Sequence, residues 1–361
     1  MNSVKSVEMH SARTAAWCIA VLFIGQMLWA QETKETVRVG EVDRSFMVRL
    51  PNEYDSQRHY PVVILLHGMN QDADDMERLT QFDRLADKDS IIAVYPLALH
   101  GGWNIGVQPQ EQPSIGMEPG RHRHYGGGGY PGGKYPGGGH PGAGQQPPSS
   151  RQPEEERRPA PADDMGFFNH MLDDLGAKFS VDASRIYVAG LSEGGLMSLR
   201  LGCALSDRIA AVAVVGAAMP KTMICLPSRP VAILIVDGTS DPIVPYNGGT
   251  EHNLNLPVIS AEESAKAWAR IDRCNEKPEK DKISAKEKSG METKVDTYNS
   301  CQRAVRVVLY SLKGGGNTWP GDEQFEVEKM VGKTSQDLSA NETIWSFLVK
   351  QRLPGQHEEA R

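Results

Sequence analysis

The sequence predicts one α/β domain in which helices cover both faces of a mostly parallel central sheet. Continuous apolar runs such as 61–66 and 231–236 are typical of central strands that are buried on both sides. Segments with helical spacing of apolar residues alternate with these runs, and this alternation favours parallel strands. Of 361 residues, those from about 35 to 351 carry the pattern and suffice for a single core.

The elements can be placed in order along the chain. An N-terminal hairpin with alternating apolar residues comes first, and central strands and helices follow it. We expect strands at 36–42, 44–50, 61–66, 91–95, 185–189, 209–215, 231–236 and 304–312, and helices at 74–86, 163–178, 195–201, 260–271 and 336–349.

The N-terminal segment 1–30 has the features of a signal peptide. A weakly basic start precedes the apolar run 15–28, and Ala30 offers a small residue before a polar stretch, where cleavage is expected. An uncleaved anchor is the alternative. Cleavage would leave a secreted protein, extracellular or periplasmic, without stable membrane insertion. Residues 352–361 are expected to form a polar tail.

A low-complexity segment at 107–161 interrupts the domain 31–351. Glycine and proline occupy 25 of the 58 positions from 105 to 162, so this stretch cannot bury enough apolar surface to fold. We expect a disordered insertion. His122, His124 and His140 could bind a metal loosely, but a solvated linker fits the composition better, and the sequence predicts no metal site and no cofactor.

Charge and cysteine content narrow the function classes. The formal net charge of −7 gives no reason to expect nucleic acid. Four cysteines remain after the leader: Cys203, Cys225, Cys274 and Cys301. An even number in an exported chain suggests two disulfides, with three connectivities open. We favour the local pairs Cys203–Cys225 and Cys274–Cys301; four buried thiols are the alternative.

Ser192 is the strongest candidate for a catalytic nucleophile. It lies in the string Gly-Leu-Ser-Glu-Gly at 190–194, between an apolar strand and a helical run. A serine on such a strand-to-helix turn presents its hydroxyl at the edge of the sheet, and the small residues Gly190 and Gly194 permit the tight turn. A plain glycine-rich turn is the structural alternative.

The residues that would serve this serine can also be named. Asp241 follows the carboxyl end of the strand 231–236, the sheet edge where Ser192 is expected, and is the candidate acid of a triad. The oxyanion donors are expected to be the backbone N–H of Glu193 and one from the loop 67–70, assigned to Met69. His67 is expected to fix that loop.

Six motifs together resemble the secreted polyhydroxybutyrate depolymerase and feruloyl esterase family, which has the α/β-hydrolase fold. The resemblance covers about 35–351 apart from the insertion. It implies that Ser192 is the nucleophile and Asp241 the acid, that the substrate is a polymeric or hydroxycinnamoyl ester, and that the two local disulfides form. The motifs are Leu-Leu-His-Gly at 65–68, Asp-Asp-Met at 74–76, Gly-Gly-Trp at 101–103, Gly-Leu-Ser-Glu-Gly-Gly at 190–195, Gly-Thr-Ser-Asp-Pro-Ile-Val-Pro-Tyr at 238–246 and Gly-Gly-Gly-Asn-Thr-Trp-Pro-Gly at 314–321.

The chain departs from this family at the base. Asn317 stands where the family has histidine, and an amide cannot accept the hydroxyl proton. Asn317 is expected within hydrogen-bonding reach of Ser192 or Asp241. The run 69–71, where the family is usually glycine-rich, is a second departure. His252 and His100 could stand in for the base, although a histidine at the rim of the site is the simpler interpretation of each. Lys313 would first have to be desolvated.

Three functions therefore compete. The first is a secreted serine esterase, weak because Asn317 replaces histidine. The second is a catalytically inactive, esterase-shaped module that binds a polyester or a polysaccharide ester. The third is a surface interaction protein that uses the Gly/Pro/Tyr-rich insertion. Turnover of a small activated ester would discriminate between the first and the second.

Overall fold

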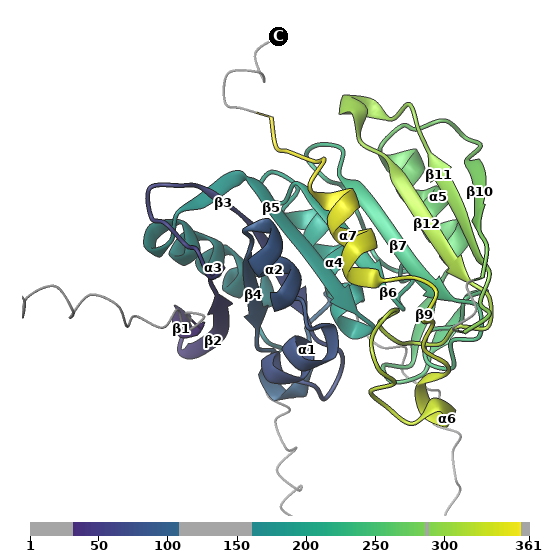
Figure 1. Cartoon of the computed structure of the whole chain (residues 1–361), viewed down its shortest axis with the longest axis horizontal. Helices are drawn as coiled ribbons and strands as arrows, with labels where there is room; N and C mark the ends of the chain where they lie inside the picture. Colours follow the sequence, from purple (N-terminus) through teal and green to yellow (C-terminus); the bar gives the residue numbers. More distant parts are fainter. Residues whose placement is uncertain (1–31, 108–160, 286–288, 355–361) are drawn as a thin grey trace, which may run out of the picture.

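A computed structural model of the chain describes residues 32–107, 161–285 and 289–354. The predicted leader, the insertion between 108 and 160 and most of the predicted tail lie outside the described residues. The expected α/β-hydrolase class is confirmed by a ten-stranded mixed sheet flanked by helices (Figure 1). In spatial order its strands are β1 (Glu32–Val39), β2 (Val42–Arg49), β4 (Ile92–Pro96), β3 (Tyr60–Leu66), β5 (Val181–Leu191), β6 (Ala211–Val215), β7 (Ala232–Gly238), β12 (Val307–Leu312), β11 (Thr293–Tyr298) and β10 (Glu279–Ile283).

The centre of the sheet, from β4 to β12, is parallel, and antiparallel strands extend it on both sides. The carboxyl ends of β3, β5, β7 and β12 therefore meet at one edge. That edge is where open α/β sheets place their ligand sites. A second, two-stranded sheet pairs β8 (Gly249–Glu251) with β9 (Leu256–Val258) in the loop region after β7.

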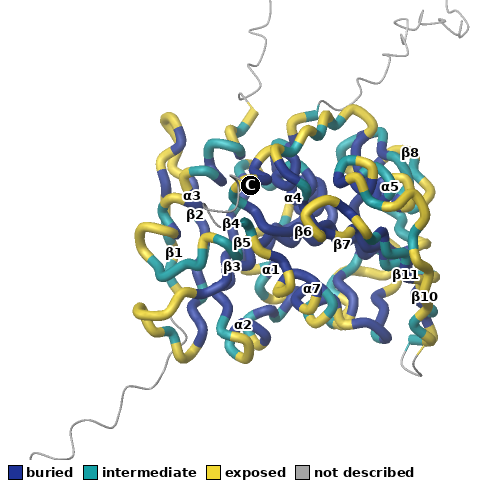
Figure 2. The backbone as a smooth tube through the Cα atoms, turned by 90° about the horizontal axis from the view of Figure 1, so that it is seen from above, coloured by how far each residue is buried: buried dark blue, intermediate teal, exposed yellow. Residues whose placement is uncertain are grey.

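Two apolar layers fill the space on the two faces of the sheet. Alternate residues of β3 enter different layers, because successive side chains of a strand point to opposite faces: Ile64 packs with one face and Leu65 with the other. Figure 2 shows the buried strands in the middle and the exposed loops outside. One layer holds α3 (Asp164–Lys178), α4 (Glu193–Ala204) and α5 (Ala261–Ile271), and the other α1 (Ala73–Thr80), α2 (Asp83–Asp89) and α7 (Ala340–Leu348).

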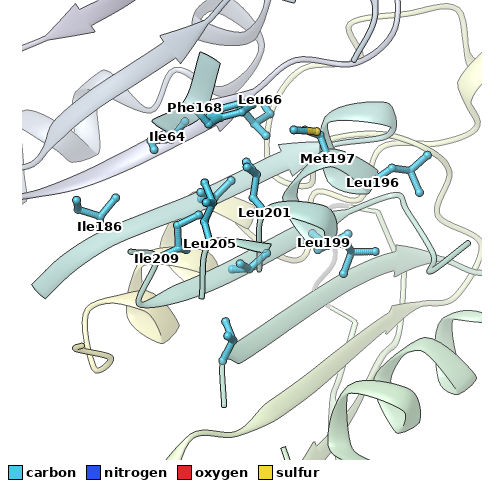
Figure 3. Packing of buried hydrophobic residues seen from close by; sticks show 14 of the residues in the cluster. Ile64, Leu66, Phe168, Ile186, Leu196, Met197, Leu199, Leu201, Leu205 and Ile209 are labelled. Atoms are coloured by element: carbon cyan, nitrogen blue, oxygen red, sulfur yellow. The ribbon is translucent and has the colours of Figure 1, made fainter. Parts of the chain in front are cut away.

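Helix α4 is the central packing element of its layer. Leu196, Leu199 and Leu201 are fully buried and belong to the same core cluster as Ile64 of β3 (Figure 3). At 25–30 cal/mol per Å², burying each leucine side chain contributes about 2 kcal/mol. This packing fixes the N-terminus of α4 against the end of β5.

Some element boundaries differ from the sequence prediction. The expected helix 74–86 is two helices, because Gln81 adopts a left-handed conformation with φ of 43°. The final helix begins at Ala340 rather than 336, where the Ser339 side chain accepts a hydrogen bond from Glu342 N–H. The last central strand begins at Val307 after the 3-10 turn Gln302–Ala304. The hairpin β10–β11 and the short helix α6 (Glu328–Val331) were not expected.

The chain on either side of residues 108–160 is held at one place. The side-chain nitrogen of Asn104 donates to the carbonyl of Ala162 at 2.7 Å, and its backbone N–H donates to Asp164 Oδ2 at 2.6 Å. Asp164 is itself buried and paired with Arg44 of β2 at 2.6 Å. Residues 104 and 162 therefore share one anchoring point beside α3.

Candidate active site

Ser192 occupies a strained turn between β5 and α4. Its φ of 55° and ψ of −118° lie outside the regions that serine ordinarily adopts. Its backbone N–H donates to Val215 O at 2.9 Å, which ties the turn to β6. A Cβ at Gly190 would lie 2.2 Å from the Gly194 carbonyl oxygen, and one at Gly194 would lie 2.2 Å from Leu66 O. Only glycine fits both positions, as the elbow interpretation requires.

A cavity of about 400 Å³ opens at this edge of the sheet and brings the loops together. Ser192 and Asn317 both line it, as does the loop 68–71 after β3. The segment after Asn317 also lines it, with the apolar side chains of Trp319, Phe325, Met330 and Val331 and the carboxyl groups of Glu323 and Glu326. The sequence analysis named this segment only as far as residue 321. Beyond that residue, apolar and acidic side chains alternate without a clear pattern, so the sequence carries no signal for the rest of the lining.

Asp241 lies at the carboxyl end of β7 and does not line the cavity. Its Oδ1 accepts hydrogen bonds from the backbone N–H groups of Ile243, at 2.7 Å, and Val244, at 2.8 Å. Burial raises the pKa of Asp241 to about 6, although these N–H groups and the Asn317 amide favour the charged form. At about pH 7 the group is mainly a carboxylate.

Asn317 fills the space between Asp241 and the cavity. Its Nδ2 donates to Asp241 Oδ2 at 2.7 Å and to the Gly216 carbonyl at 2.8 Å. The expected contact between Asn317 and Asp241 is thereby confirmed. Both amide hydrogens are engaged, so only the oxygen Oδ1 remains, and it can accept a hydrogen bond but not a proton at neutral pH. Within the described residues, the Ser192 hydroxyl makes no hydrogen bond with Asn317.

The two N–H groups expected to stabilise an oxyanion come from neighbouring elements. Glu193 is the first residue of α4, where backbone N–H groups have no acceptor inside the helix. Met69 lies in the loop 68–71, in which the Gln71 side chain accepts from Gly68 N–H at 2.8 Å. Asn70 N–H donates to Gly101 O at 2.7 Å. The chemical role of Glu193 and Met69 stays a prediction.

His67 is buried beneath this loop. Its Nε2 accepts a hydrogen bond from Ala98 N–H at 3.1 Å, so the proton resides on Nδ1, which donates to Gly68 O at 2.7 Å. Burial lowers the pKa of His67, and the ring is neutral. These contacts support its expected role in fixing the loop.

The structure does not bring the other basic candidates into the cavity. His100 and His252 are both exposed, and neither lines the cavity that contains Ser192. Lys313 is exposed as well. None of the described residues that line the cavity is a histidine. Across the described ranges, no cluster of histidine, cysteine and acidic residues could hold a metal. His122, His124 and His140 lie outside those ranges.

Sequence reasoning missed two buried carboxyl groups beside the site. Asp237 at the end of β7 accepts a hydrogen bond from the Ala217 N–H at 3.1 Å, and its pKa is raised well above the usual range by burial and by Asp241. The side chain of Glu193 is also buried, and burial raises its pKa to about 8. An acidic residue in a glycine-rich turn ordinarily suggests a solvated position, so no sequence signal indicated this burial.

Both local disulfides are present. Cys203 of α4 joins Cys225, and Cys274 joins Cys301. The first anchors the loop after β6 to α4, and the second connects the end of α5 to the segment that leads into β12. Among the described residues, no helix is long and apolar enough to cross a membrane.

Comparisons with known proteins agree with this arrangement. The model of a family described as "Putative esterase" matches residues 38–123. The putative esterase NocK of Nocardia uniformis subsp. tsuyamanensis is 25% identical over 299 residues, which are 80% of this chain and 74% of the relative. The chain is related to the esterases.

Two further proteins match this chain over different fractions of its length. Feruloyl esterase B of Piromyces equi is 33% identical over 163 residues, which are 43% of this chain but only 29% of that longer protein. Among solved structures, an acetyl xylan esterase from Aspergillus awamori is 14% identical with a TM-score of 0.48, covering 79% of this chain and 94% of the other.

Proposed function

We propose that this esterase relative is a secreted serine carboxylic ester hydrolase with Ser192 as its nucleophile. The observation that carries the proposal is the strained turn at Ser192, which places the residue on a cavity that Asn317 also lines. Asp241 would be the acid of an incomplete triad. Two disulfides in the described chain fit an oxidising compartment outside the cytosol.

The reaction would follow the two steps of serine esterases. Ser192 Oγ attacks the acyl carbon, the alcohol leaves with a proton, and water then hydrolyses the acyl-enzyme to release the acid. The developing negative charge on the carbonyl oxygen would be stabilised by the N–H groups of Glu193 and Met69. Asn317 cannot take the proton of Ser192, so water or hydroxide in the cavity must accept it, and the rate should be low.

The substrate we propose is an ester of a polymer or of a hydroxycinnamic acid. The apolar side chains of Trp319, Phe325 and Met330 line the same cavity as Ser192 and are suited to contact an aromatic or aliphatic acyl chain. The feruloyl esterase among the relatives supports this class.

A second function is favoured by Asn317. A site that keeps nucleophile and acid but lacks the base could bind an ester without turning it over. Hydrolysis of p-nitrophenyl acetate and methyl ferulate by the purified mature chain decides between the two, with Ser192→Ala as the matched control. Turnover that the control abolishes supports the hydrolase; saturable binding of methyl ferulate without turnover supports the binding module.

A further inference from the structure

Glu193 follows the proposed nucleophile in the chain, and its side chain is buried. Only 4% of the residue is exposed, and the nearby backbone N–H of Trp103 favours the charged form of its carboxyl group. The neighbouring Gly102 is so close that a Cβ there would lie 3.1 Å from Glu193 Oε1 and 3.3 Å from Oε2. The carboxyl group of Glu193 therefore packs against the backbone of segment 101–103.

The segment 101–103 in turn holds the loop after β3. Gly101 O accepts the backbone N–H of Asn70 at 2.7 Å, and the Trp103 indole N–H donates to His67 O at 2.9 Å. The rings of Trp103 and His67 are in contact, with centroids 5.0 Å apart. Segment 101–103 thus packs against Glu193 on one side, and on the other it is hydrogen-bonded to residues 67 and 70, between which Met69 lies.

We propose that Glu193 is a positioning residue whose carboxyl group, through segment 101–103, sets the place of the loop 68–71 relative to the start of α4. This inference rests on the proposed function, since the two N–H groups it would align are the oxyanion donors of that reaction. One residue would then supply one donor from its backbone and position the other through its side chain.

The charge state of Glu193 suits this role. Burial raises the pKa of Glu193 to about 8, and the negative charges of Glu251 and Asp164 raise it further, so the carboxyl group is mostly neutral at about pH 7. A neutral group can pack against segment 101–103 without adding a negative charge beside the place where an oxyanion forms. Within the described chain, Glu193 Oε2 is buried and has no hydrogen-bond partner, so its ionised form would lack stabilisation there.

Amide hydrogen exchange tests the positioning directly and does not require turnover. In Glu193→Ala, exchange at the Asn70 N–H, bonded to Gly101 O, should accelerate at least about tenfold, whereas the Ala217 N–H, bonded to Asp237, should not change. Glu193→Gln keeps the length and nearly the shape of the side chain that packs against Gly102 and should restore most of the protection. Exchange at Asn70 within about twofold of wild type in Glu193→Ala would overturn the proposal.

Labelling of Ser192 by a fluorophosphonate supplies the chemical readout. The rate constant of labelling should fall about tenfold or more in Glu193→Ala and recover largely in Glu193→Gln. Asp272→Asn is the matched control, because it alters a buried carboxyl group away from segment 101–103. Asp272 Oδ1 accepts a hydrogen bond from Val231 N–H at 3.1 Å. The labelling rate of this variant should stay within about twofold of the wild-type rate.

The pH dependence adds a test that a merely structural role would not satisfy, and it needs only the conservative variant. The ratio of the wild-type labelling rate to that of Glu193→Gln should decline several-fold between about pH 7 and 9, as the carboxyl group ionises beside the charge that develops on the phosphonyl oxygen. A flat ratio would overturn the proposal. Absence of labelling in every variant would reject the proposed function, and the exchange experiment would still decide whether Glu193 positions the loop.

Discussion

The side-chain amide of Asn317 is held between Asp241 Oδ2, at 2.7 Å, and the carbonyl of Gly216, at 2.8 Å. Asp241 therefore interacts with a group that can neither accept nor pass on a proton. The carboxylate, its backbone donors and the strained serine are all in place around a side chain that lacks basicity. In the proposed triad, position 317 is the member without a basic side chain.

Asn317→His should raise kcat/KM for a small activated ester about 10²- to 10⁴-fold, because a general base would be restored next to Asp241. The measurement is hydrolysis of p-nitrophenyl acetate by wild type and variant, with Ser192→Ala added to the variant as a control. No gain in a folded Asn317→His protein would indicate that the loop 69–71 is the greater defect. Loss of the gain in the double variant would assign it to Ser192.

Gly194→Ala should destabilise the fold by about 3 kcal/mol or more, because the new methyl group would lie 2.2 Å from Leu66 O and 2.6 Å from His67 O, which are backbone atoms. Urea unfolding gives the free-energy difference. The matched control is Gly176→Ala, at a solvent-exposed position within α3. A Cβ there meets nothing within 4 Å, and the free energy of unfolding should rise by about 0.5–1 kcal/mol. Equal effects at the two sites would contradict the tight elbow.

Replacing Cys203 and Cys225 together by alanine should lower the free energy of unfolding by about 3 kcal/mol in the chain-entropy model, and the pair Cys274 and Cys301 by a similar amount. The sequence separations of 22 and 27 residues are alike, so neither loss should dominate. Peptide mapping without reduction checks the pairing first. A cross-linked peptide joining Cys203 to Cys301 would disprove the arrangement.

Stability should fall as pH rises through the range in which Asp272 ionises. Burial raises the pKa of Asp272 to about 7, whereas an aspartate in an unfolded chain has a pKa of about 3.9. The folded state therefore binds this proton more tightly, and the stabilisation is present in full below about pH 4 and is lost as the pH rises through about 7.

Asp272→Asn should remove that part of the pH dependence, which amounts to about 4 kcal/mol for a pKa difference of about 3 units. Urea unfolding of both proteins between about pH 4 and 8 makes the comparison. Parallel stability curves for wild type and variant would show that Asp272 is not the group responsible.

The sequence was sufficient for the central strands and the elbow, because Val231–Val236 and the glycines around Ser192 carry strong local signals. It was insufficient for β10, whose residues Glu-Lys-Asp-Lys-Ile have the composition of a solvated loop and form a strand only by pairing with β11 at the edge of the sheet. The burial of Glu193 was equally unforeseeable, since it depends on segment 101–103, which is ninety residues away in sequence. Contacts between distant loops leave no periodic pattern in the chain.

The shared anchoring of Asn104 and Ala162 has a consequence for how this domain can be remodelled. The described chain stops at residue 107 and resumes at residue 161, and the contact between Asn104 and Ala162 holds these two ends together. The distance that the connection must span is therefore fixed by this contact and not by the length of the connection. Loop-closure entropy grows slowly, by about 0.6 kcal/mol for each doubling of length, so exchanging the connection costs little. The connection between 107 and 161 can therefore be replaced by a binding peptide, by a whole second domain or by a short linker.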